Sequence, residues 1–214
     1  MARLTGTGRL ADDLYLIAHH EVSGKPLLQP RAAGLGLAGA LLAELLLSGR
    51  IQIGPDRVAV ADPAPPEDAL AGSVLGQMLG EAEPHDAATW LLYLARTAAA
   101  DVAGRLAQSG YLTRASARRG WRGGRWVPVD AECAFVPVAR VKSALDPSRE
   151  LNVHGAALAG LAAACGLGSR LALYLPPKAD RALSEAVRRL DPGLRELIAR
   201  TQAAVDSALL SHRV

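Results

Sequence analysis

The stretch from Gly34 to Gly49, GLGLAGALLAELLLSG, most limits what this chain can fold into. It is the longest apolar run in the sequence, and as a helix it would be apolar on nearly all sides. It spans about fourteen residues between its glycine ends and carries Glu44, whereas a membrane span needs about 20 apolar residues. The sequence therefore predicts a buried helix at the centre of a folded core.

The composition suits close-packed helices around such a centre. Half of the 214 residues are apolar, only 4% are aromatic, and Ala, Leu and Gly are abundant. Such a core needs no metal or disulfide, and Cys133 and Cys165 form no CxxC pair. The N-terminal segment lacks the apolar core of a signal peptide. We therefore expect one domain over residues 1–214 in a reducing cytoplasm.

Hydrophobic spacing predicts a mainly α fold, namely a central helical bundle ringed by amphipathic helices, with short β-hairpin insertions. The predicted helices cover residues 10–19, 34–47, 66–82, 87–110 with Asp86 as the cap, 131–145, 151–168, 178–190 and 192–210. Alternating residues predict one hairpin within residues 50–62 and a second one formed by YLTRAS and GRWVPV. Pro137 is expected to kink or interrupt the helix that contains it.

The turn of the second hairpin, RRGWRGGRW at residues 118–126, has an unusual composition. It holds four arginines, three glycines and two of the three tryptophans of the chain. Guanidinium groups bind phosphate oxygens in pairs, and tryptophan prefers the membrane interface. The pattern predicts a hairpin that dips into a layer of lipid headgroups. Surface electrostatics are assigned to Arg118, Arg119, Arg122 and Arg125, and interfacial insertion is assigned to Trp121 and Trp126.

The distribution of charge also indicates an anionic partner. Residues 1–101 carry 7 basic and 12 acidic side chains, whereas residues 102–214 carry 17 and 9. Residues 102–129 contain six arginines and no acid. Such a stretch fits lipid headgroups or nucleic acid, and it also fits an ordinary solvated face.

Two other classes of protein fit the same region. A helix followed by a tight turn and a basic hairpin is also the order of a winged-helix DNA-binding protein. A protein-interaction scaffold without a ligand is the third reading, with either tryptophan folded back onto the helices. The small-residue stretch from Gly155 to Gly166 could pack within one chain or across a dimer, so a homo-oligomer stays open.

Signals of catalysis and cofactor binding are weak. GLGLAG at Gly34 has the wrong spacing for a dinucleotide fingerprint and lies inside an apolar helix. The cluster His19, His20 and Glu21 converges poorly on one ion, because adjacent residues on a helix point about 100° apart. No serine lies in a nucleophile-elbow pattern. We therefore expect no enzyme, no metal and no cofactor.

The order of motifs resembles the bacterial branch of the Golgi phosphoprotein 3 family. The similar segments are RLADDLYLIAHHEVSGK, GALLAELLLSGRI, RLAQSGYL, RWVPVD and VARVKSAL, and together they cover about residues 8–210. The resemblance implies a compact helical fold and a peripheral membrane protein without enzymatic activity. It also implies binding of phosphatidylinositol 4-phosphate through a basic pocket, insertion of an apolar hairpin, and recruitment of protein cargo.

The resemblance carries over to the pocket only in part. The family has a tryptophan and an arginine where this chain has Gln29 and Ala38, and it has two arginines where this chain has Arg96 and Ala99. Arg31 lies close enough to Gln29 in sequence to supply charge. Strict specificity for the 4-phosphate therefore stays open, whereas general binding of anionic lipids depends on the hairpin arginines, which are independent of the pocket.

Overall fold

The computed structural model describes residues 7–115, 125–146, 150–175 and 179–211, and the long apolar helix lies at its centre. This helix, α2 (Pro30–Leu47), is long and apolar enough to cross a membrane by length and composition, yet 72% of its residues are buried inside the protein. The prediction of a buried central helix is confirmed. α2 begins four residues earlier than predicted, at Pro30, because proline favours the first position of a helix.

Two helices pack along most of α2. They are α1 (Leu10–Ile17) and α10 (Pro192–Leu210). Small residues in α2 allow neighbouring segments to approach closely. A Cβ atom on Gly39 would lie 2.7 Å from the Thr201 hydroxyl of α10, and one on Gly36 would lie 2.2 Å from the sulfur of Cys165, which follows α7. The glycines that interrupt the apolar run therefore serve helix packing.

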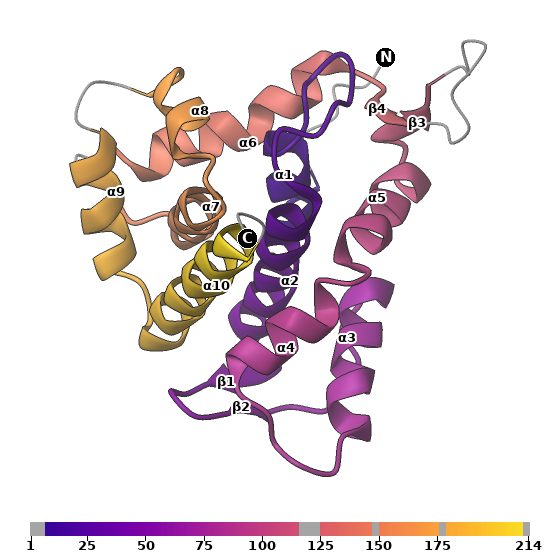
Figure 1. Ribbon diagram of the computed structural model, residues 1–214, viewed down its shortest axis with the longest axis vertical. Coiled ribbons are helices and arrows are strands. Elements are labelled where there is room, and N and C mark those ends of the chain that lie inside the picture. The colour runs from indigo at the N-terminus through magenta and orange to yellow at the C-terminus, as the bar shows by residue number, and fades with distance from the viewer. Residues whose placement is uncertain (1–6, 116–124, 147–149, 176–178, 212–214) are drawn as a thin grey trace.

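The remaining helices ring this centre (Figure 1). They are α3 (Ala69–Gly80), α4 (Ala87–Leu94), α5 (Ala98–Gln108), α6 (Ala131–Ala144), α7 (Val153–Ala164), α8 (Gly168–Ala172) and α9 (Ala179–Arg188). Two antiparallel hairpins complete the fold: β1 (Ile51–Ile53) with β2 (Val58–Val60), and β3 (Leu112–Arg114) with β4 (Trp126–Pro128). The predicted fold class, a mainly α bundle with short hairpins, is confirmed.

The helices differ from the predictions at three places. The helix predicted over residues 87–110 is divided into α4 and α5, because the amides of Arg96 and Thr97 bond to carbonyls three residues back and tighten the turn. The hydrophobic period continues across this break, so the sequence pattern does not reveal it. Pro137 lies inside α6 without interrupting it. The short helix α8 was not predicted, since five residues are too few for a periodic pattern.

The two hairpins lie at opposite ends of the molecule (Figure 1). The β3–β4 hairpin shares its end with α6, α8 and the connection between α1 and α2, whereas β1 and β2 lie at the other end. The chain thus gathers segments from four parts of the sequence around the base of the basic hairpin.

Candidate functional site

The base of the basic hairpin is an arginine–tryptophan pair. Arg114 and Trp126 are partners across the β3–β4 ladder, and the Arg114 guanidinium lies 4.2 Å from the centre of the Trp126 ring. Trp126 is partly buried and packs against the hydrophobic core. The predicted site residues Arg118, Arg119, Trp121 and Arg122 lie outside the described residues.

The connection between α1 and α2 supports this hairpin from one side. Gly24 has a positive φ of 62°, and a Cβ atom there would lie 2.0 Å from the Trp126 carbonyl oxygen. Arg125 donates a hydrogen bond from Nη1 to the Ser23 carbonyl at 3.2 Å. His20 Nδ1 accepts hydrogen bonds from two amides of the same connection, Val22 and Ser23. The α1–α2 connection is therefore ordered by its own hydrogen bonds and supports the base of the hairpin.

Arg31 and Arg96 both lie close in sequence to the contact that α2 makes with the break between α4 and α5. A Cβ atom on Gly34 would lie 2.5 Å from the Ala95 carbonyl, and Arg31 lies one helical turn before Gly34. Both arginines are exposed, and Arg96 lies 5.6 Å from the centre of the Tyr93 ring. Within the described part of the chain, neither arginine forms an ion pair.

The other positions assigned to the family pocket differ in accessibility. Gln29 is exposed and precedes α2 as its N-cap residue. Ala38 has no exposed surface, and Ala99 is partly buried against the core. The positive charge of this surface therefore comes from Arg31 and Arg96 rather than from the three remaining positions.

A buried ionic cluster around Arg105 was missed by sequence reasoning. Arg105 donates from Nε to Asp12 at 2.8 Å, from Nη1 to Asp68 at 2.7 Å, and through both Nη atoms to Glu44 at 3.0 and 3.1 Å. The Ala11 amide donates to Glu44 at 2.8 Å. The one available signal was Glu44 itself, a lone acid in an apolar helix, which requires a buried partner.

Burial dominates the electrostatics of this cluster. Desolvation raises the pKa of Asp12 and of Glu44, although Arg105 acts in the opposite direction on both. Burial also raises the pKa of Asp68, but the Ala71 amide and Arg105 outweigh it and leave that pKa below its ordinary value. The single guanidinium of Arg105 thus offsets the desolvation of Asp68 but not that of Asp12 or Glu44. Arg105 is 8% exposed and its guanidinium is bonded to these acids, so it is unavailable for contacts with DNA bases.

A second buried carboxylate, Asp13, lies next to this cluster. It pairs with Arg140, and it lies 3.1 Å from His154 Nε2. Asp12 and Asp13 are both fully buried, and each keeps one carboxylate oxygen without a hydrogen-bond partner among the described residues. These contacts tie α1 to α5, α6 and α7, and we assign them to the stability of the bundle.

The histidines near the end of α1 have structural contacts. His19 stacks on Tyr15, with ring centres 4.0 Å apart, and its Nδ1 lies 2.7 Å from the Tyr15 carbonyl. Glu21 accepts a hydrogen bond from Arg170 at 2.8 Å. Across the described ranges, no group of three or more His, Cys, Asp or Glu side chains could hold a metal ion.

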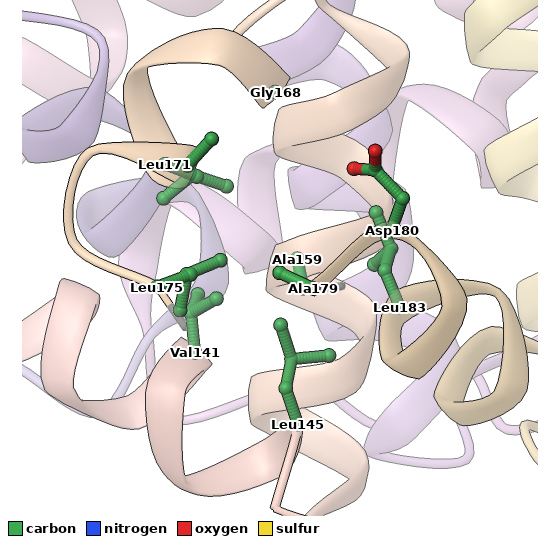
Figure 2. A pocket seen from close by; sticks show the side chains of 10 residues that line it. Val141, Leu145, Ala159, Gly168, Leu171, Leu175, Ala179, Asp180 and Leu183 are labelled. Carbon is green, nitrogen blue, oxygen red and sulfur yellow. The ribbon is translucent and has the colours of Figure 1, made fainter. Parts of the chain in front are cut away.

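A recess between α6, α7, α8 and α9 has a different chemistry. Its volume is only about 20 Å³, and its lining is apolar except for Asp180 (Figure 2). Leu171 and Leu175 point into it toward Val141 and Leu183 (Figure 2). The described residues that line this recess include no basic side chain, so they do not suit a phosphate group.

The fold and this surface define a class: a mainly helical bundle that presents a basic hairpin at one end. Comparison with known families is more specific, because the sequence model of the family described as Golgi phosphoprotein 3 (GPP34) matches residues 10–209. The chain belongs to this family. A search of curated protein sequences finds no match.

Proposed function

We propose that this protein is a peripheral membrane protein that binds anionic phospholipid headgroups. The observation that carries the proposal is the pair Arg31 and Arg96, two exposed arginines from distant parts of the sequence that both lie near the contact between Gly34 and Ala95 and have no ion-pair partner in the described ranges. Guanidinium groups without an internal partner can form bidentate bonds with phosphate oxygens. Membership of the family supports the same role.

The hairpin base adds a second contribution to the same function. Arg114 and Arg125 keep positive charge beside Trp126, whose ring is partly buried and able to contact the interface. Each basic side chain near an anionic membrane contributes about 1 kcal/mol, so several of them hold a small protein reversibly. The proposal is a binding role and assigns no catalytic step to any residue.

The binding test is co-flotation with vesicles of phosphatidylcholine alone, with added phosphatidylglycerol, or with added phosphatidylinositol 4-phosphate. We expect the protein to float with both anionic vesicles and not with neutral ones, and to detach as salt rises. A strong preference for the phosphoinositide would show that Arg31 and Arg96 suffice for a selective pocket. Absence of flotation with all three vesicles would overturn the proposal.

A charge-reversed variant tests the site within this function. Arg31→Glu combined with Arg96→Glu is expected to weaken binding about thirtyfold or more, since two contributions of ~1 kcal/mol each are lost and repulsion is added. The matched control is Arg57→Glu with Arg195→Glu, which changes the net charge equally. Both control arginines are exposed and belong to the β1–β2 end, where Gly193 approaches Ile53. Equal weakening in the two variants would mean that net charge alone drives binding.

A further inference from the structure

Exposed apolar side chains gather at the end of the molecule that carries the basic hairpin. We define the end patch as Val22, Phe135, Leu173 and Tyr174. Leu173 is 77% exposed and Val22 is 69% exposed, while the two aromatic rings are about two-fifths exposed. Single exposed apolar residues are ordinary on a protein surface, but four of them from three segments at one end form a patch that requires an explanation.

Side-chain contacts link these segments to one another. The rings of Phe135 in α6 and Tyr174 after α8 meet edge to face at 6.1 Å. Arg170 of α8 binds Glu21 in the α1–α2 connection at 2.8 Å. The same connection receives the Arg125 hydrogen bond at Ser23. The end patch therefore runs from α6 through α8 and Val22 to the base of the hairpin, and Figure 1 places these elements at the same end.

The C-terminal end of α8 is fixed to the rest of the protein by buried apolar side chains. Leu171 is 3% exposed, and it points with Leu175 into the apolar recess between α6 and α9 (Figure 2). The intervening residues, Leu173 and Tyr174, are directed to solvent. Leu171 and Leu175 therefore anchor the chain at α8, and the exposed side chains of Leu173 and Tyr174 between them form an apolar protrusion.

The charge around the end patch is positive. The described parts of its segments, together with the hairpin base, hold six basic side chains against four acidic ones when Asp13, the partner of Arg140, is counted. The basic residues are Lys25, Arg114, Arg125, Arg140, Lys142 and Arg170, and the acidic residues are Asp13, Glu21, Asp130 and Glu132. Apolar and aromatic side chains set among cations are the composition of surfaces that lie in the headgroup region of anionic bilayers.

We propose that the end patch is a second membrane-contact site, which enters the boundary between headgroups and acyl chains of an anionic bilayer beside the hairpin. This inference rests on the proposed lipid-binding function and adds the orientation of the protein on the membrane. The base of the hairpin and the tip of α8 face the bilayer together, with the long axis of the molecule directed away from it. Continuity with the basic hairpin and the positive rim favour a lipid surface over a protein partner.

The direct test places an environment-sensitive fluorophore on the α8 tip. Leu173→Cys is labelled with a nitrobenzoxadiazole dye, and the matched control is Leu79→Cys in the last turn of α3. Leu79 is 51% exposed and lies near the β1–β2 end, where the Val58 amide bonds to the His85 carbonyl. Cys133 and Cys165 are each 2% exposed, so the wild type gives the background of labelling.

With phosphatidylglycerol vesicles, we expect a blue shift and a gain in emission at position 173 and no change at position 79. Leu173→Ser with Tyr174→Ser is expected to lower the vesicle partition coefficient about tenfold or more, because two apolar side chains lose their burial in lipid. Leu79→Ser is expected to leave it unchanged. Circular dichroism of the double variant confirms that the helices are retained.

The outcomes separate this inference from the proposed function. If the wild type floats with anionic vesicles but position 173 stays solvent-like and the double variant binds equally, the second contact site is wrong and lipid binding stands. If the wild type does not float at all, both are wrong. If light scattering shows a dimer without vesicles that the double variant abolishes, the end patch is a contact between two copies and the inference is overturned.

Discussion

Burial separates two kinds of arginine in this protein: the buried Arg105, which is ion-paired within the fold, and the exposed Arg31 and Arg96. Arg105 is 8% exposed and is surrounded by Asp12, Glu44 and Asp68. Arg31 and Arg96 are exposed and form no ion pair in the described ranges. The buried arginine has used its hydrogen-bonding capacity within the fold, whereas the exposed pair keeps its capacity for a ligand. Net charge alone does not distinguish these roles.

The largest expected difference in stability is between a variant that lacks the buried arginine and one that lacks an exposed arginine. Arg105→Met leaves three carboxylates without their shared counterion, and loss of one partner from a buried ionic group costs about 3–5 kcal/mol of unfolding free energy. Arg96→Met is expected to change it by no more than about 0.5 kcal/mol. Urea denaturation measures both, and similar values for the two variants would contradict the distinction.

The next largest effect on stability is expected for Gly24, in the α1–α2 connection that supports the hairpin. Gly24→Ala is expected to cost about 2 kcal/mol or more, because the new Cβ meets the Trp126 carbonyl and the residue must keep a positive φ. The control is Gly49→Ala, where φ is 72° but nothing lies within 4 Å, and about 1 kcal/mol is expected there. Faster amide exchange at Val129 in Gly24→Ala alone would locate the damage at the hairpin base.

The interior cluster also predicts opposite pH dependences for two of its acids. The folded-state pKa of Asp68 is lowered, so its stabilising contribution is present above its ordinary value of 3.8 and is lost as pH falls through the folded pKa. The folded-state pKa of Glu44 is raised above 4.5, so its contribution is present at low pH and is lost as pH rises through the folded pKa.

Two variants measure these slopes by urea denaturation between pH 3 and 7. The wild type is expected to gain stability relative to Asp68→Asn as pH rises over the range. Relative to Glu44→Gln it is expected to lose stability over the same range. Parallel slopes for the two variants would contradict the unequal sharing of Arg105.

The smallest effect concerns the arginine–tryptophan pair at the hairpin base. Arg114→Gln removes an exposed cation–π contact, which contributes about 0.5–1 kcal/mol. Arg57→Gln serves as the control, with no measurable change expected. Thermal denaturation compares the stabilities, and vesicle flotation reports whether Arg114 also contributes to binding.

Much of the fold follows from local sequence patterns. Apolar residues on all sides of α2 predict its burial, and the alternation of Ile51 and Ile53 with polar residues predicts β1. The division between α4 and α5 was not predictable, since neither Gly nor Pro marks it and the apolar face continues. That break matters for the candidate site, because it places Arg96 beside the first turns of α2.

The helical bundle, the basic hairpin and the family could be predicted from the sequence, because hydrophobic period, charge and motif order are properties of neighbouring residues. Which arginines are neutralised could not be predicted, because it depends on tertiary contacts. Arg105 lies 61 residues from Glu44 and 93 from Asp12 along the chain, yet it bonds to both. Pairing over such separations depends on helix packing, which also sets the burial that separates a structural charge from one available to a ligand.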